Sequence, residues 1–161
     1  MYTTTLQVPQ YIAEYIQSKY PAETEESRSR NLFDQTIYVR FPDELDVYHL
    51  IYDLLRKRPE NAAPETGNLH IVLPERNAGK RPETYNYLSA KSQLIISRRL
   101  SVMFWTEVHT FVEREKHKLG INYCDSVEHM LAVYDINSIT SDALIKNYYR
   151  WRRKIQKHSK L

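Results

Sequence analysis

The sequence predicts a mainly helical α+β fold, with a small two-stranded sheet and a helix-turn-helix-like hairpin at its carboxyl end. Three observations favour this class. Apolar residues recur at helical spacing over most of the 161 residues. Only two short segments alternate as strands do. The last sixteen residues contain seven Lys or Arg side chains and no Asp or Glu, and they follow an apolar pattern typical of a helix.

The chain is predicted to begin with a helix followed by a polar loop. Pro9 is suited to a helix start, and helical spacing continues to about Lys19, where Pro21 prevents further extension. Residues 22–30 are charged, rich in serine and without large apolar side chains. Such a composition is typical of an exposed or disordered loop.

A strand, a helix and a second strand are predicted next. Residues 35–41 alternate with β-branched and aromatic side chains, residues 43–57 place apolar side chains at helical spacing, and residues 69–73 form the second strand. This order fits a right-handed βαβ crossover or a helix that interrupts an antiparallel pair. Two strands alone are marginally stable, so we expect a helical cover or a partner chain.

The longest helical pattern runs over residues 82–118 and is closed by Gly120. Unbroken, it would measure roughly 55 Å, more than a globule of this size covers. We therefore expect a break at Ser89, or a projecting helix that meets a second subunit. Residues 89–118 are accordingly the predicted interface of a homodimer.

A short helix is predicted after Gly120. Asp125 and Glu128 have the spacing of a capping box ahead of an apolar run, and turn-forming residues follow from Asp135. We expect residues 1–120 to form an α+β core domain and residues 121–161 to form a basic helix-turn-helix-like segment packed on it.

The last predicted helix covers residues 142–155, with Thr140 or Ser141 as its cap. One face is apolar, because helical spacing unites Leu144, Tyr148, Trp151 and Ile155. A short helix, a turn and a longer basic helix form the order of a DNA-binding helix-turn-helix. Any packing hairpin of two helices gives the same order, and this plain structural role is the alternative.

The opposite face of this helix is basic. The last sixteen residues hold seven of the 23 basic side chains, so residues 1–145 contain 16 basic against 20 acidic side chains and the chain is strongly asymmetric in charge. Such asymmetry indicates a polyanionic partner. We predict duplex DNA, and alternatively an acidic protein. The predicted DNA contacts are Lys146, Asn147, Arg150, Arg152, Arg153, Lys154 and Lys157.

No pattern predicts an enzyme, a cofactor, a metal site or a small-molecule substrate. Gly79 and Lys80 resemble the end of a P-loop, but Arg81 occupies the Ser/Thr position. His109, Glu113 and His117 share a helical spacing that could hold a metal, yet a solvated helix face is the simpler interpretation.

The cysteine and glycine content and the lack of targeting signals further restrict the class of protein. Cys124 is the single cysteine, so no internal disulfide is possible, and it is expected to pack rather than to react. Three glycines leave few of the backbone positions that nucleotide sites use. No targeting pattern or bilayer-spanning run is recognised, so we expect a soluble, cytoplasmic protein without membrane contact.

Two segments carry a resemblance to a known group of proteins. Residues 80–89 (KRPETYNYLS) and 142–152 (DALIKNYYRWR) resemble small proteins encoded by Mu-like prophages and related mobile elements of gut Bacteroidetes. The resemblance covers the latter half of the chain. It implies a setting rather than a mechanism, because that group has no assigned activity from which functional residues could be transferred.

Overall fold

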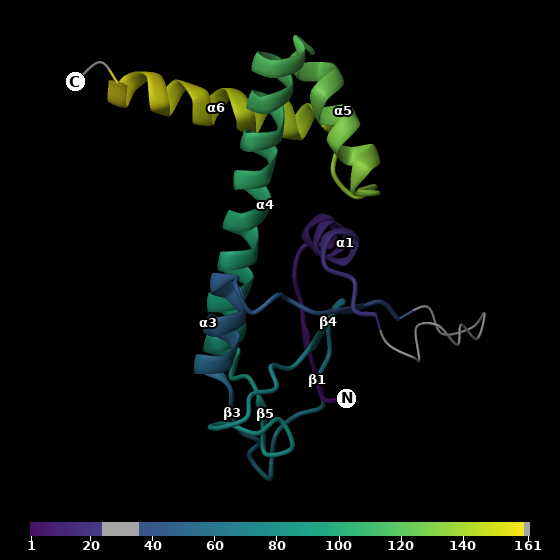
Figure 1. Cartoon of the computed structure of the whole chain (residues 1–161), viewed down its shortest axis with the longest axis vertical. Coiled ribbons are helices and arrows are strands. Elements are labelled where there is room, and N and C mark those ends of the chain that lie inside the picture. Colours follow the sequence, from purple (N-terminus) through teal and green to yellow (C-terminus); the bar gives the residue numbers. More distant parts are fainter. Residues whose placement is uncertain (24–35, 160–161) are drawn as a thin grey trace. The chain divides into compact units, whose positions relative to one another are not determined.

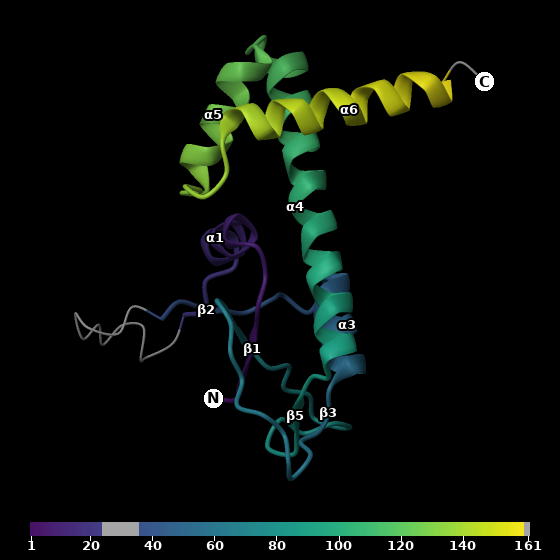
Figure 2. The same ribbon diagram turned by 180° about the vertical axis from the view of Figure 1, so that it is seen from behind.

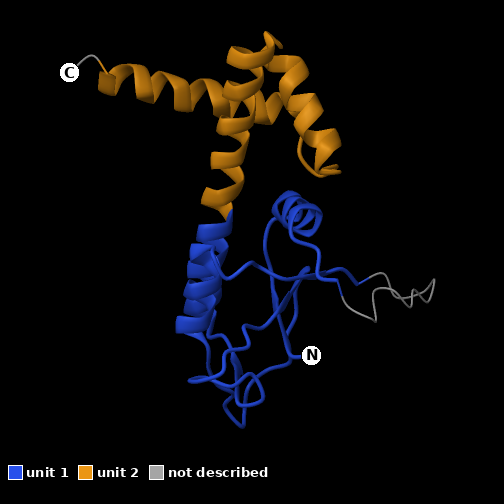
Figure 3. Cartoon of the chain, viewed as in Figure 1, with its two compact units in different colours: residues 1–100 blue, residues 101–161 orange. Residues whose placement is uncertain are grey.

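The computed structural model describes residues 1–23 and 36–159 and divides the chain into two compact units (Figures 1 and 3). Unit 1 comprises residues 1–100 and unit 2 residues 101–161, so the division falls within helix α4 (Ala90–Leu119) rather than after residue 120. The described part is mainly helical with a minor sheet, which confirms the predicted fold class. Most of the loop predicted over residues 22–30 lies outside the described residues.

The sheet of unit 1 has three strands in the order β1-β4-β2. Strand β4 (Leu69–Val72) lies in the middle, antiparallel to β1 (Thr3–Leu6) and parallel to β2 (Tyr38–Val39). Because β2 and β4 are parallel, the βαβ crossover is the correct one of the two predicted alternatives. The prediction of a two-stranded sheet missed β1, because three consecutive threonines give no alternation of apolar and polar residues.

The helix of this crossover, α3 (Asp46–Leu54), is shorter than predicted. Residues 56–57 leave the helix to form β3 (Arg56–Lys57), which pairs antiparallel with β5 (Tyr85–Tyr87) in a second, two-stranded sheet. The Lys80 ammonium donates hydrogen bonds to the carbonyl oxygens of Tyr52 and Asp53, at 3.1 and 2.8 Å. These bonds satisfy carbonyls that a helix end leaves free, so Lys80 closes α3.

The core of unit 1 is formed by buried side chains of the sheet, α1 (Gln10–Lys19), α3 and the start of α4. Its buried side chains include Leu6, Ile12, Tyr15, Ile16, Val39, Ile51, Leu69 and Ile71. Helix α1 confirms the predicted first helix. A Cβ atom on Gly67 would lie 2.2 Å from the Leu6 carbonyl oxygen, so only glycine allows the chain to pass here.

Helix α4 begins at the predicted break. The Ser89 hydroxyl accepts the backbone N–H of Ser92 at 3.2 Å, and residues 85–87 upstream belong to β5 instead of the helix. The helix then runs for 30 residues without interruption. Gly120 ends it with φ 66° and an N–H bond to the Lys116 carbonyl at 3.2 Å, as predicted for a glycine in the left-handed region.

Unit 2 contains the greater part of α4 (residues 101–119), α5 (Tyr123–Val133) and α6 (Ser141–Ser159) (Figures 1 and 2). Asn122 caps α5, because its side-chain oxygen accepts the Asp125 N–H at 2.9 Å. The predicted capping box that begins at Asp125 is therefore wrong. Asn122 is as good a cap, and it starts the helix three residues earlier than a cap at Asp125 would.

A left-handed residue turns the chain between α5 and α6. Asp135 has φ 50°, its N–H bonds the Ala132 carbonyl at 3.3 Å, and the Ile136 N–H bonds the Leu131 carbonyl at 2.8 Å. These two bonds form a Schellman motif, with the buried Ile136 as its apolar contact. The turn thus uses Asp135 where glycine is usual.

A small apolar core holds the three helices of unit 2 together. Its buried side chains are Phe104, Val108, Phe111, Val112, Val127, Met130, Ile136, Leu144 and Tyr148. Glu115, only 3% exposed, accepts hydrogen bonds from Ser126 at 2.9 Å and His129 at 2.9 Å, which ties α4 to α5. Among the described helices, none is both long and apolar enough to cross a bilayer.

Candidate nucleic-acid interface

Helix α6 starts and extends much as its sequence predicts. The Thr140 hydroxyl accepts the Ala143 N–H at 3.2 Å, so Thr140 is the cap. The helix continues to Ser159, four residues beyond the predicted end at Ile155. Its predicted apolar face is partly wrong: Leu144 and Tyr148 are buried, but Trp151 is half-buried and Ile155 is 46% exposed.

Trp151 marks the last firm contact of α6 with α4. Its indole stacks on the His109 imidazole, with ring centroids 4.4 Å apart and planes inclined by 14°. His109 Nε2 also lies 2.8 Å from the Asn147 side-chain oxygen. Burial lowers the pKa of His109, and the Asn147 bond offsets this only in part. The imidazole therefore tends to stay neutral, as an N–H donor to Asn147.

A charged hydrogen bond joins the same two helices one turn away. The Tyr148 hydroxyl donates to Glu113, and His117 Nε2 lies 2.7 Å from the same carboxylate. Burial raises the pKa of Glu113, but hydrogen bonds from Tyr148 and His117, together with nearby Arg152, lower it overall. Burial and the Glu113 carboxylate raise the pKa of Tyr148. A charged acceptor and a protonated donor make this a strong bond.

These contacts correct the solvated-face interpretation of residues 109–117. His109 and Glu113 are half-buried against α6, and only His117 is exposed. Their spacing could have indicated a shared face of α4. No pattern in these residues indicated that α6 would cross that face. Among the described residues, no group of three metal-ligating side chains is arranged to hold an ion.

Two of the predicted DNA contacts are engaged inside unit 2. Asn147 bonds His109, as described above. Arg152 donates to the Tyr123 hydroxyl, and its guanidinium carbon lies 5.4 Å from the Tyr123 ring centroid. Both side chains are half-buried. We therefore revise their assignment: Asn147 and Arg152 hold α6 in place on α4 and α5.

The other five predicted contacts, Lys146, Arg150, Arg153, Lys154 and Lys157, are exposed. Lys146 forms a 2.9 Å ion pair with Asp142, and both side chains are largely in solvent. In the part of the chain that the structure describes, the remaining four make no ion pair. No Asp or Glu follows Asp142 in the sequence, so the charged side chains of this surface are all cations.

The net charge of the chain resides in unit 2. Unit 1 contains 13 basic and 13 acidic residues, whereas unit 2 contains 10 basic and 7 acidic ones. The difference of three equals the formal charge of the whole chain, +3. The exposed face of α6 is therefore the main source of positive potential.

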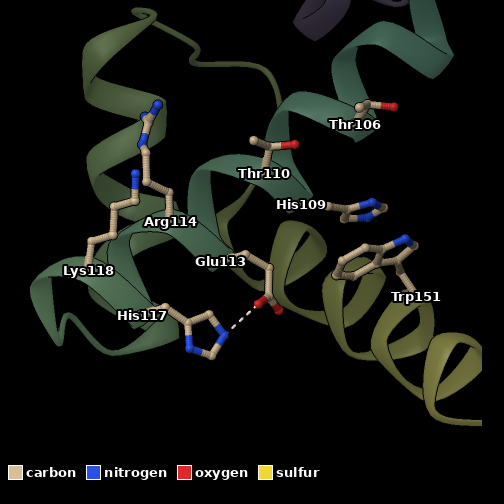
Figure 4. A pocket seen from close by; sticks show the side chains of 8 residues that line it. All are labelled: Thr106, His109, Thr110, Glu113, Arg114, His117, Lys118 and Trp151. Carbon is tan, nitrogen blue, oxygen red and sulfur yellow. Dashed lines mark hydrogen bonds and ion pairs between the residues drawn. The ribbon is translucent and has the colours of Figure 1, made fainter. Parts of the chain in front are cut away.

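An open groove of about 560 Å³ lies between α4 and α6 (Figure 4). Trp151 and His109 line one side, and Arg114 and Lys118 extend away from them. Glu113, the acidic residue in its lining, is already bonded to Tyr148 and His117. Small-molecule sites bury most of their ligand's surface, and this groove is too open for that.

Comparison of the chain with protein-family models, curated proteins and solved structures found no significant match. The exposed cations of α6 and the contacts that anchor it are thus the features from which a function can be argued.

Proposed function

We propose that this protein binds duplex DNA through the exposed face of α6, with α5 and α6 acting as a helix-turn-helix. The observation that supports the proposal is the group of five exposed cations on a helix whose opposite face is anchored in a core. The anchored part of the helix, which bears Lys146 and Arg150, presents its charges at fixed positions, and this suits recognition of a regular polyanion.

The spacing of these cations suits a phosphate backbone. Lys146, Arg150, Lys154 and Lys157 recur every three or four residues and so lie about 4.5–6 Å apart along the axis. Lysine and arginine that contact phosphates release counterions from DNA, and this release is the main source of non-specific affinity. Asn147 and Arg152 contribute indirectly, by holding the helix.

The biological setting that we propose is a phage or mobile element, with a role in regulation, replication or transposition in the cytoplasm. The resemblance of residues 80–89 and 142–152 to prophage-encoded proteins supports it. We propose no catalytic step, because the polar clusters of unit 2 connect helices instead of lining an enclosed pocket.

An acidic protein is the second candidate partner. Its support is the apolar surface on the same helix, where Tyr149 is 39% and Ile155 46% exposed. Protein interfaces combine such side chains with arginine, whereas phosphate contacts need no apolar area.

Titration of a fluorescent mixed-sequence duplex with the full chain, followed by anisotropy at several salt concentrations, tests the proposal. Four phosphate contacts predict a slope of about −3.6 in log affinity against log salt. The double variant Arg150→Ala/Lys154→Ala should lose most of the affinity. Its matched control is Arg56→Ala/Lys57→Ala, which removes the same charge from exposed positions of unit 1.

Three outcomes of this titration would contradict all or part of the proposal. A wild-type protein without salt-dependent binding to the duplex would overturn the DNA proposal. Equal losses in both double variants would place the contact elsewhere than on α6. Binding to an acidic protein but not to DNA would establish the second candidate instead.

A further inference from the structure

The exposed face of α6 divides into two strips of different chemistry. At about 100° per residue, Lys146, Arg150 and Lys157 lie within about 40° of one another around the axis. The neighbouring strip, within about 60°, contains Tyr149, Arg153 and Gln156. The first strip contains point charges and one guanidinium. The second contains an aromatic ring, a planar guanidinium group and a side-chain amide.

The second strip lines a surface hollow of about 320 Å³, together with Arg152. Tyr149, Arg153 and Gln156 are exposed, and among the described residues the Arg153 and Gln156 side chains have no hydrogen-bond partner. Tyr149 is steadied by Tyr123, with ring centroids 5.9 Å apart and planes at 86°. The strip therefore begins at Tyr149 on the anchored part of the helix, and its unused donors and acceptors lie on the free part that follows Trp151.

We infer that Tyr149, Arg153 and Gln156 read base edges in the major groove, while Lys146, Arg150 and Lys157 contact phosphates. This inference rests on the proposed DNA binding. A guanidinium fork matches the two acceptors of guanine, O6 and N7, and a glutamine amide matches the donor and acceptor of adenine, N6 and N7. The Tyr149 ring packs on a thymine methyl group.

The spacing of the strip sets the length of the sequence that it reads. Tyr149, Arg153 and Gln156 rise by about 6 Å and then about 4.5 Å along the helix. Base pairs follow one another every 3.4 Å, approximately. Each successive side chain thus reaches a base pair one or two steps further on, and the three together address a segment of about four base pairs.

The first turn of α6 explains why the reading positions lie further along the helix. Helix-turn-helix proteins usually contact bases from the amino-terminal end of the recognition helix. Here that end bears Asp142, whose side chain is 72% exposed and pairs with Lys146. Phosphates repel a carboxylate, so the part of α6 that comes closest to the DNA shifts towards residues 149–156.

Selection of duplexes from a random pool by the full chain, followed by anisotropy on selected and scrambled sequences, tests the inference. We expect enrichment of a short element containing guanine and adenine. Gln156→Ala and Arg153→Lys should each reduce the preference for the selected sequence by about 5- to 150-fold. Both should leave the affinity for scrambled duplex and the salt slope nearly unchanged.

Lys157→Ala is the matched control from the phosphate strip. It should weaken binding to selected and scrambled duplexes equally and reduce the magnitude of the salt slope by about 0.9. Thermal melts check that each variant is folded. These substitutions lie at exposed positions, so folding is expected to be retained.

The outcomes separate this inference from the proposal beneath it. Salt-dependent binding without enrichment, or full preference retained in Gln156→Ala and Arg153→Lys, would overturn base reading by this strip and leave DNA binding intact. Absence of binding to any duplex would remove both. A loss of preference in Lys157→Ala alone would assign base reading to the other strip.

Discussion

The indole of Trp151 lies flat on the imidazole of His109, 4.4 Å away, at the point where α6 leaves α4. Amino-terminal to this contact, Leu144 and Tyr148 are buried, and carboxyl-terminal to it every described residue from Arg153 onward is exposed. The stacked pair is thus the boundary between the anchored and the free part of the helix.

Replacement of Trp151 tests this boundary. Trp151→Ala should lower the free energy of unfolding by about 2–3 kcal/mol, below the usual range for a fully buried tryptophan because this one is half-buried. Ile155→Ala, one turn further on and 46% exposed, should change it by less than about 0.5 kcal/mol. Urea unfolding monitored by circular dichroism measures both, and similar values for the two would move the boundary.

The Tyr148 hydroxyl should be coupled to the Glu113 carboxylate. Tyr148→Phe removes the donor and should destabilise unit 2 by about 1.5–3 kcal/mol, since the acceptor is charged. In a double-mutant cycle with Glu113→Gln, we expect a coupling energy of about 0.5–3 kcal/mol. Additive effects of the two changes would show that the bond contributes nothing to stability.

Acid should weaken unit 2 in two stages. The pKa of His109 lies below its ordinary 6.5, so the unfolded chain takes up this proton first and stability falls as pH drops below about 6.5. The pKa of Glu113 lies below its ordinary 4.5, so its contribution is present above that pH and is lost as pH falls through the folded value.

Urea unfolding between pH 7.5 and 3.5 measures this dependence. His109→Gln keeps a donor for Asn147 and should remove the upper stage while leaving the lower one. An unchanged upper stage in that variant would assign it to another histidine.

Asp135 provides a test in the stabilising direction. Its φ of 50° is costly for residues with a Cβ atom, and glycine avoids that cost. Asp135→Gly should therefore raise the free energy of unfolding by about 0.5–1 kcal/mol. Asp135→Ala should lower the free energy of unfolding, because alanine lacks the short polar side chain that makes a positive φ less costly for Asp. Thermal melts would contradict the argument if both variants shifted in the same direction.

The predicted homodimer is tested by light scattering at micromolar concentration. Val102 is 61% exposed on α4, so the predicted interface would include it. We expect twice the chain mass of 19.2 kDa, and Val102→Asp should shift the protein towards the monomer. A wild-type mass of 19.2 kDa would exclude the dimer and the pairing of two DNA half-sites, but not DNA binding.

The sequence predicted those elements whose signal is local. Pro9, Ser89 and Gly120 mark helix ends by backbone chemistry alone, and the structure places the ends of α1 and α4 beside them. The parallel pairing of β2 with β4 was one of two predicted alternatives, because pairing depends on distant parts of the chain. Strand β1 was missed because Thr4, although buried, is polar. Its burial depends on the strand beside it and cannot be predicted from the residue itself.

The exposed cations of the candidate interface could be predicted from the sequence, but the side chains that hold α6 on α4 and α5 could not. Spacing alone identified Arg150, Arg153 and Lys157 as exposed side chains. The roles of Asn147 and Arg152 depend on partners 38 and 29 residues away, His109 and Tyr123. Side chains that bridge helices look the same in sequence as side chains that face solvent.

The free end of α6, from Arg153 to Ser159, has a thermodynamic consequence of its own. Its helical order depends on backbone hydrogen bonds, because its side chains have no core to pack on. Arg153, Lys154 and Lys157 repel one another at spacings of one, three and four residues, which loosens the helix. A polyanion that neutralises them removes this repulsion, so ligand binding and helix formation reinforce each other. Amide hydrogen exchange in this last segment should therefore slow when the ligand binds, and quicken again when salt displaces it.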